Sequence, residues 1–422
     1  METSEVEKFN LKNFLSTKSA AVIIASTVAV VGVGTMIVSD SVADGNKIML
    51  GVRSDGQPIG GLDKIGAERF FNDVATKKIH NLTFRYEGEE FVITPEEINL
   101  TAQVDKATNE ALSYGRGGSA FGNFNDQMKC LLNGRNVQLD AQYDSALLDE
   151  KLNAIAAKVN RDPVNALVKL SSDGTIQKFP GVIGKKLNTQ ELAENLKMPL
   201  TTLNLPTGII DLKPEEVQPF ITTEDISEID SVLGTYSTYY YPGDRGDNIW
   251  LAANSISDKI VKPSWTFSFN DTVGERTWDA GYKVAGVIIN GRPAEDYGGG
   301  VCQVSSTLYN AVLLAGLTPT ERTPHFFQSS YIGYGRDATV ADGQIDFKFR
   351  NDLPHNVYLI AEAYGSTLSV YVLGTKADLG GSDIAVELDG NSLYRVWYNG
   401  NDVIRSEFLH TDVYETPKPR QD

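Results

Sequence analysis

The sequence is short of the side chains that build metal sites and disulfide frameworks. Its 422 residues include only two cysteines, Cys130 and Cys302, and four histidines. A structural zinc site takes about four Cys or His ligands, whereas one histidine, His325, lies within reach of Cys302 in the sequence. We therefore predict no metal and no other cofactor. The two cysteines are 172 positions apart and nothing local pairs them, although a disulfide between them stays an alternative in an oxidising compartment.

Positive charge is also scarce. The chain has 38 Lys and Arg against 55 Asp and Glu, which gives a formal net charge of -17 and a pI near 4.8. Extended contact with nucleic-acid phosphates needs a concentrated basic face. The composition therefore excludes nucleic acid and other polyanions as expected partners.

Charge is absent altogether from residues 19–38, SAAVIIASTVAVVGVGTMIV. Such a run is about as long as a helix that spans a bilayer, and Lys8, Lys12 and Lys18 before it predict a cytoplasmic N-terminus. We expect a single-pass protein of the cell membrane whose bulk is extracytoplasmic. A cleaved signal peptide is the alternative, but the leader is long and the residues that follow offer only a weak cleavage pattern.

The rest of the chain has the pattern of two related modules and a larger domain. The sequence TPEE at 94–97 is echoed by KPEE at 213–216, each after an apolar β-type run, which indicates two copies of a small α+β module. We predict an α+β fold with a cytoplasmic leader at 1–18, the transmembrane anchor at 19–38, modules at 45–125 and 126–220, a larger domain at 235–375 and a β appendage with a tail at 376–422.

Three patterns predict elements inside the larger domain. A 3.6-residue apolar stripe after Asp247, which runs from Ile249 to Ile260, predicts a helix that ends before Pro263. The strict alternation of QIDFKFR at 344–350 predicts a strand. Two apolar runs on either side of 364–366 predict a hairpin.

The stretch YGGGVCQ at 297–303 places a rare thiol directly after three glycines. Apolar residues recur every three or four positions from Val301 to Ala315, and Gly316 provides a stop, so Cys302 is expected in the first turn of a helix. The free N–H groups there stabilise a thiolate and can hold an oxyanion, and glycines let a substrate approach the backbone. A small buried hydrophobe is the alternative role for such a cysteine.

A thiol nucleophile needs a base, and His325 follows Cys302 by 23 residues. A helix-borne cysteine followed by a strand-borne histidine is the order found in papain-like and transglutaminase-like folds, in which a third polar residue orients the imidazole. Asp337 and Asp346 are the candidates for that residue. Arg336 is either the partner of an internal ion pair or a cation for a substrate carboxylate.

Three stretches in this region resemble the VanW domain, a family named from glycopeptide-resistance clusters. They are FSFNDTVGERTWDAGYKVAGVIING at 267–291, YGGGVCQVSSTLYNAVLLAGL at 297–317 and PHFFQSSYIGYGRDATVADGQIDFKFRND at 324–352. The resemblance covers about residues 247–375, and the modules before it resemble the peptidoglycan-binding repeats that commonly precede this domain. One departure is Phe326, where the family usually has serine after the motif histidine.

The resemblance implies a cysteine L,D-transpeptidase, an acyltransferase that makes 3-3 cross-links between peptidoglycan stem tetrapeptides on neighbouring glycan strands. The catalytic residues that it implies are Cys302, which forms a thioester, and His325, and we predict Asp337 as the third catalytic residue. The predicted substrate-binding residues are Gly298, Gly299, Gly300, Gln303, Ser305, Ser306, Arg336 and Asp346.

Three alternatives remain open at this stage. With water as the acceptor, the same site is an L,D-carboxypeptidase. The ectodomain could instead bind glycan strands without catalysis, or it could be a transglutaminase-like enzyme that cross-links proteins.

Overall fold

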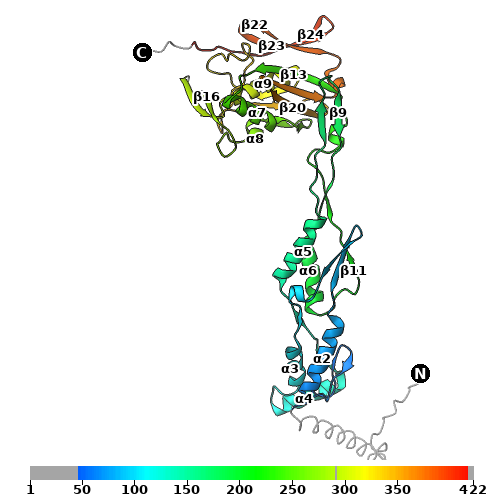
Figure 1. Ribbon diagram of the computed structural model, residues 1–422. Coiled ribbons are helices and arrows are strands. Elements are labelled where there is room, and N and C mark those ends of the chain that lie inside the picture. Colours follow the sequence, from blue (N-terminus) through cyan, green and yellow to red (C-terminus); the bar gives the residue numbers. More distant parts are fainter. Residues whose placement is uncertain (1–45, 290–291, 417–422) are drawn as a thin grey trace, which may run out of the picture. The chain divides into compact units, whose positions relative to one another are not determined.

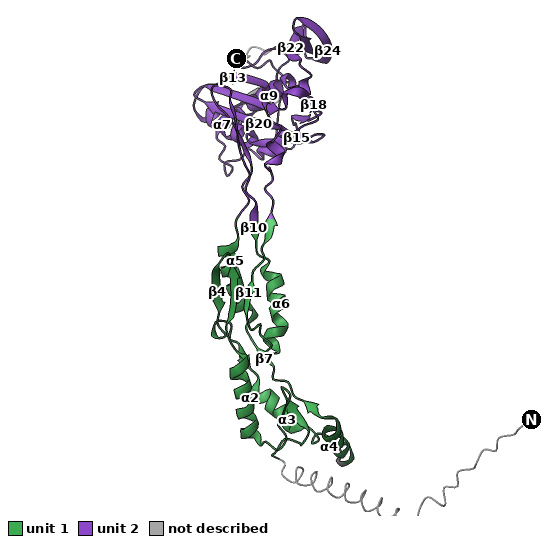
Figure 2. Ribbon diagram, turned by 90° about the vertical axis from the view of Figure 1, so that its right-hand side faces the viewer, with its two compact units in different colours: residues 1–161, 185–216 green, residues 162–184, 217–422 purple. Residues whose placement is uncertain are grey.

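The computed structural model describes residues 46–289 and 292–416, which form a mixed α and β structure (Figure 1). The chain divides into two compact units: unit 1 comprises Met1–Arg161 and Lys185–Glu216, and unit 2 comprises Asp162–Gly184 and Val217–Asp422 (Figure 2). The predicted leader and anchor lie outside the described residues. Of the helices that are described, none is both long and apolar enough to cross a membrane.

Unit 1 combines helices with short strands. Its helices are α2 (Lys64–Lys78), α3 (Val104–Ser113), α4 (Ala120–Asn133), α5 (Ser145–Val159) and α6 (Thr189–Thr201), with the 3-10 turn η2 (Glu96–Ile98). Its strands are β1 (Val52–Ser54), β2 (Gln57–Pro58), β3 (Leu82–Tyr86), β4 (Glu89–Ile93), β5 (Thr101–Ala102), β6 (Arg135–Asn136), β7 (Ala141–Gln142) and β11 (Ile209–Asp211), and β10 (Gly184–Lys186) pairs with β12 (Glu215–Val217) at the unit boundary.

The two predicted modules are not separate in unit 1. Strand β11 pairs in parallel with β3, so a strand of the second predicted module completes the sheet of the first. One hydrophobic cluster runs from Ile48 to Leu212, and the predicted boundary at 125/126 falls inside helix α4. The echoed motifs also differ, because the first forms η2 whereas the second enters strand β12. Pairing between distant strands therefore joins what the sequence pattern divides.

Unit 2 is built from antiparallel sheets around three helices. The helices are α7 (Asp244–Ile256), α8 (Phe269–Val273) and α9 (Val301–Leu314), with η3 (Glu224–Ile226) and η4 (Lys376–Leu379). The strands are β8 (Leu167–Leu170), β9 (Ile176–Phe179), β13 (Ser231–Tyr239), β14 (Lys259–Val261), β15 (Thr266–Ser268), β16 (Val284–Ile289), β17 (Arg292–Tyr297), β18 (Thr318–Glu321), β19 (Lys348–Arg350), β20 (Val357–Tyr364), β21 (Thr367–Gly374), β22 (Asp383–Asp389), β23 (Ser392–Asn399) and β24 (Asp402–Thr411).

Helix α9 lies at the centre of this unit and packs against the four-stranded sheet β13-β21-β20-β14 (Figure 1). It is buried on nearly every side, although polar residues such as Gln303, Ser305 and Ser306 interrupt its apolar sequence. Strand β13 carries a bulge between Val232 and Gly234, and a Cβ added at Gly234 would lie 2.4 Å from the Ala311 carbonyl oxygen. Glycine at this position lets the strand touch the helix backbone, which fixes the depth of α9 in the core.

The local predictions in unit 2 hold with two adjustments. Strands β20 and β21 form the predicted hairpin around Gly365, whose φ is +61°. The predicted helix exists as α7, but it ends at Ile256 because Ser257 is extended and Asp258 has a φ of +56°, so Ile260 lies in β14 instead. The predicted strand at 344–350 is shorter, since only Lys348–Arg350 pairs as β19.

The C-terminal sheet β22-β23-β24 belongs to unit 2 and shares its core. Val386 and Leu393 join the same hydrophobic cluster as helix α9. The buried Arg395 guanidinium donates to the Leu317 carbonyl at 2.5 Å and pairs with Glu407. The segment predicted as an appendage therefore packs into the domain it follows.

Candidate active site

Cys302 is the second residue of helix α9, as the sequence predicts. The helix follows Gly300, whose φ of 114° turns the chain into its first turn. The Val301 and Gln303 amides donate to the Gly298 and Gly300 carbonyls at 3.0 and 2.9 Å. Within the described part of the chain, nothing accepts a hydrogen bond from the Cys302 amide. This N–H and the positive end of the helix dipole are therefore free to bind an oxyanion beside the thiol.

The three glycines are buried, and protein atoms occupy the side on which each would carry a Cβ. A Cβ on Gly298 would lie 2.8 Å from Arg276, and one on Gly299 would lie 2.7 Å from the Ala285 backbone. A Cβ on Gly300 would meet Arg245 at 3.0 Å. Packing against neighbouring segments accounts for all three glycines, and substrate contact at these positions stays a prediction.

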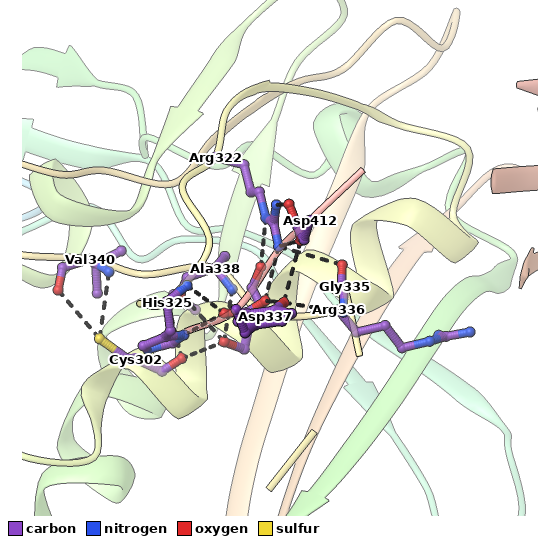
Figure 3. Close-up of polar contacts among 12 residues, drawn as sticks. Cys302, Arg322, His325, Gly335, Arg336, Asp337, Ala338, Val340 and Asp412 are labelled. Atoms are coloured by element: carbon purple, nitrogen blue, oxygen red, sulfur yellow. Dashed lines mark hydrogen bonds and ion pairs between the residues drawn. The ribbon is translucent and has the colours of Figure 1, made fainter. Parts of the chain in front are cut away.

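The thiol is partly buried and points at the backbone of Val340. Cys302 Sγ lies 3.3 Å from the Val340 carbonyl oxygen and 3.5 Å from the Val340 amide nitrogen (Figure 3). Cys302 and Cys130 are both free, so the alternative of a disulfide does not occur.

The His325 ring lies beside the thiol on one side and Asp337 on the other (Figure 3). Its Nδ1 is 2.6 Å from Asp337 Oδ2, and its backbone amide donates to the same oxygen at 2.6 Å. The prediction of a strand-borne histidine was wrong, because β18 ends at Glu321 and His325 lies in the irregular segment that follows. The carboxylate holds this segment by both backbone and ring.

The three side chains stabilise one another as charged groups. Burial raises the pKa of the Cys302 thiol, but the hydrogen bond and charge of His325, with help from Val340 and Arg276, lower it below its usual value. Burial lowers the pKa of His325, but the hydrogen bonds of Asp337 and Cys302 outweigh it and raise that pKa to about 9. Burial raises the pKa of Asp337, yet its hydrogen bonds from His325 and Tyr414 bring it below the usual range. The arrangement favours a thiolate next to an imidazolium.

Of the two candidates for the third polar residue, only Asp337 contacts His325. Asp346 lies apart, where it accepts hydrogen bonds from Ser268 Oγ at 2.6 Å and from the Asn270 amide at 2.9 Å. Its side chain closes the turn before helix α8 and is 7% exposed. The structure therefore gives Asp346 a structural role, and its contact with substrate stays a prediction.

Arg336 also differs from its predicted role. Its side chain extends away from Asp337 (Figure 3), donates to Asn310 Oδ1 at 3.2 Å and to the Val386 carbonyl, and lies over the Tyr236 ring. The ion pair that we considered with Asp337 is made by Arg322 instead, at 2.9 Å. Arg336 therefore fastens helix α9 to strand β22.

The polar residues that follow Cys302 in the helix face inward. Ser305 Oγ donates to the Ala338 carbonyl at 2.6 Å, and Ser306 Oγ accepts from the Ala338 amide at 3.0 Å. Gln303 donates to the Tyr239 carbonyl at 2.9 Å, and all three side chains are at most 1% exposed. They tie α9 to the segment after Asp337 and to β13, so the prediction that they bind substrate is corrected.

Several residues near the thiol escaped the sequence analysis. The hydroxyl of Tyr331 is buried with no hydrogen-bond partner among the described atoms, and its ring meets His325 edge-on at 6.4 Å. Burial, and then the charge of Cys302, raise the pKa of this hydroxyl. Arg322, Asp412 and Tyr414 contact Asp337 or one another. Lone Tyr, Arg and Asp residues carry no distinctive spacing, so no pattern in the sequence identifies them.

An open groove of about 480 Å³ flanks the segments that position Cys302. Its lining includes Arg276, which packs against Gly298, and Asp342, two residues beyond Val340, and these two side chains form an ion pair. Its carboxylates outnumber its cations: Asp271, Glu275, Glu321, Asp342 and Asp346 against Arg276 and Lys348. The groove therefore suits a cationic group better than an anionic one.

Known proteins match both halves of the described chain. The family model described as "VanW like protein" matches residues 244–373, and the one described as "Putative peptidoglycan binding domain" matches residues 82–204. The second match is one domain across both predicted modules. No solved structure matches the chain, so a papain-like or transglutaminase-like architecture stays a prediction.

Two curated proteins are similar to this chain. The uncharacterized protein YoaR of Bacillus subtilis is 38% identical over 216 residues, which is 50% of this chain and 69% of YoaR. The vancomycin B-type resistance protein VanW of Enterococcus faecalis is 32% identical over 146 residues, which is 33% of this chain and 52% of that protein. A VanW-like domain and a peptidoglycan-binding domain in one chain indicate a function associated with the cell wall. The chain belongs to the VanW-like family.

Proposed function

We propose that this protein is a cysteine L,D-transpeptidase that forms 3-3 cross-links in peptidoglycan. The Cys302 thiolate would attack the carbonyl carbon of the third stem residue, at its L-centre, and the C–N bond to the terminal D-Ala would break. The resulting thioester would pass its acyl group to the side-chain amine of a diamino acid on a neighbouring stem, which forms an amide and returns the thiol.

The observation that carries the proposal is the contact of His325 with both Cys302 and Asp337 at the start of helix α9. In the first step the His325 imidazolium would protonate the departing D-Ala nitrogen. In the second step the neutral ring would take the proton of the incoming amine. Proton transfer of this kind contributes about 10²- to 10⁴-fold to a rate.

The free Cys302 amide at the helix start supports an acyl-transfer reaction. A carbonyl under attack by Sγ would place its developing negative charge next to this N–H and the positive end of the α9 dipole. The loss of one such donor costs about 10²- to 10³-fold in turnover in enzymes of this kind.

The acidic groove supports an amine as the acceptor. An ammonium group on the second stem would be attracted by carboxylates such as Asp271 and Glu275, next to the segments that hold the thiol. Water carries no charge and gains nothing from this lining. This feature therefore favours transpeptidation over L,D-carboxypeptidation.

The location of the substrate agrees with the expected topology. We propose that residues 19–38 anchor the chain in the cell membrane, so that both units lie on the outer side, where wall peptides are found.

The test incubates the full chain with disaccharide-tetrapeptide and follows the products by mass spectrometry. The parent protein should form a thioester adduct, a cross-linked dimer and free D-Ala, and the Cys302→Ala variant should form none of them. A tripeptide without a dimer would make the enzyme a carboxypeptidase.

A non-catalytic wall-binding protein is the second candidate, and the match of residues 82–204 to a peptidoglycan-binding domain favours it. In that case the parent and the Cys302→Ala variant would sediment equally with purified wall, and neither would form an adduct or product. The Cys130→Ala variant serves as the matched control, because it removes the other thiol and leaves the candidate site intact.

A further inference from the structure

Two of the residues that help to hold Asp337 in place, Asp412 and Tyr414, lie beyond both family matches. The matches end at residues 204 and 373, whereas the chain returns to the candidate site at Asp412 and Tyr414, directly after strand β24. Tyr414 contacts the Asp337 carboxylate oxygen that His325 does not use, and Asp412 acts through Arg322, which donates to that same oxygen.

The Asp337 carboxylate is 1% exposed and is saturated with donors. Its Oδ2 accepts from the backbone and ring of His325. Its Oδ1 accepts from Arg322 Nη2 at 2.9 Å and from the Tyr414 hydroxyl. The carboxylate therefore cannot rotate about its own axis without breaking hydrogen bonds at both oxygens.

Arg322 is in turn fixed by Asp412. Its Nη1 donates to Asp412 Oδ1 at 2.8 Å and its Nη2 to Asp412 Oδ2 at 2.6 Å, a two-point ion pair with the side chains 8% and 5% exposed (Figure 3). The Arg322 Nε also donates to the Asp337 carbonyl at 2.7 Å. A planar guanidinium held at three positions gives Asp337 a donor in a fixed direction.

Residues 412–414 are themselves held in place by contacts with Tyr334 and Gly335. The Tyr334 hydroxyl donates to the Asp412 carbonyl at 2.8 Å, and the Gly335 amide donates to the Tyr414 hydroxyl at 3.2 Å. The Tyr334 and Tyr414 rings meet edge-to-face at 4.8 Å. Strand β23 packs in the core of unit 2. The C-terminal sheet therefore holds residues 412–414 next to Arg322 and Asp337.

We infer that the C-terminal segment completes the active site: Tyr414, with the Asp412–Arg322 pair, positions Asp337 and through it the His325 ring that serves Cys302. The inference rests on the proposed function insofar as Cys302 is the reacting group. Tyr414, Asp412 and Arg322 are positioning residues in this scheme, because none of them contacts the thiol. A domain cut at the end of the family match would lack two of the three.

The experiment measures how fast iodoacetamide alkylates Cys302 as a function of pH, in the full chain with Cys130→Ala as the background. Alkylation reports the thiolate and needs no wall substrate. In Tyr414→Phe we expect the onset of alkylation to move up by about one pH unit and the rate at pH 7 to fall about 10-fold. The reason is that an Asp337 carboxylate held by fewer hydrogen bonds is less well oriented to stabilise the imidazolium. Asp412→Asn should shift the onset in the same direction.

Tyr398→Phe is the matched control, since this hydroxyl also contacts a carboxylate in the C-terminal sheet, that of Glu387, through an exposed hydrogen bond outside the candidate site. It should leave the alkylation profile unchanged. Thermal unfolding identifies any variant that fails to fold, and Asp412→Asn then carries the test. Folded Tyr414→Phe and Asp412→Asn proteins with the parental profile would overturn the inference. A shifted profile in a protein without turnover would uphold it and refute only the proposed reaction.

Discussion

The two cysteines of this protein lie in helices of equal length but at opposite ends. Helices α4 and α9 both have 14 residues. Cys302 is the second residue of α9, whereas Cys130 is three residues from the end of α4, where its carbonyl accepts the Gly134 amide at 2.9 Å. Burial raises the pKa of Cys130 and Arg135 offsets this only in part, whereas His325 brings the pKa of Cys302 down. Position in the helix and a charged partner, more than residue type, therefore decide which thiol is reactive.

The largest expected effect comes from exchanging the two thiols for alanine. Cys302→Ala should abolish both alkylation at neutral pH and any acyl transfer, because no other described thiol has an imidazole partner. Cys130→Ala should leave both unchanged within about twofold and lower the stability by about 1–2 kcal/mol, since Cys130 is a small buried hydrophobe. Labelling followed by peptide mass spectrometry locates the modified residue. Preferential labelling of Cys130 would contradict the comparison.

Removal of the His325 imidazole should raise the pKa of the Cys302 thiol, as burial already does for Cys130. In His325→Ala the thiol loses the partner that lowers its pKa, while burial remains. We expect turnover to fall by about 10²- to 10⁴-fold and the onset of alkylation to move to higher pH. His355→Ala is the control, because that imidazole pairs with Asp378 at 2.8 Å, outside the candidate site. An equal loss in both variants would argue against a specific role for His325.

The pH dependence should follow the raised pKa of His325. The folded value of about 9 lies above the ordinary 6.5, so the proton stabilises the folded protein fully below pH 6.5, and this contribution is lost as the pH rises through about 9. Acyl transfer should decline over the same alkaline range, because the imidazolium is needed to protonate the leaving amine. Asp337→Asn removes the strongest favourable partner of the imidazolium, so both declines should begin at lower pH. Thermal unfolding and turnover of the parent and of Asp337→Asn, measured from pH 6 to 10, test this pH dependence. Identical curves for the parent and the variant would contradict it.

The smallest effect on reactivity should come from the buried Asp346. Asp346→Asn weakens acceptance from Ser268 and Asn270, which should lower stability by about 1–3 kcal/mol. The alkylation profile of Cys302 should stay unchanged. Urea unfolding measures the first quantity, and a shift in the alkylation profile would mean that Asp346 also acts on the site.

Local patterns predicted the elements with strong periodicity. The hairpin β20–β21 and helix α7 follow apolar repeats that a single segment satisfies by itself. The start of α9 was also predictable, because an apolar repeat with helical spacing begins directly after the glycine run. Helix ends and the short strand β19 were less accurate, since one residue with positive φ, such as Asp258, ends an element without changing the apolar pattern.

The site was only partly predictable for a different physical reason. Gln303, Ser305 and Ser306 are polar, which usually indicates exposure, yet they are buried because the segment after Asp337 and strand β13 supply their hydrogen-bond partners. The sequence of a central helix does not show whether a polar side chain faces solvent or a backbone carbonyl. Its partner is known only once the fold is known.

The amino-acid sequence by itself determined that a rare thiol begins an apolar helix, and that His325 follows it closely enough to reach it. Only the tertiary structure decided that Asp337 and not Asp346 meets the histidine, that Arg336 faces away, and that Tyr414 closes the site from the end of the chain. The first facts depend on neighbours a few residues apart, where backbone geometry sets the contacts. The second depend on packing between segments up to 77 residues apart, which local periodicity does not encode.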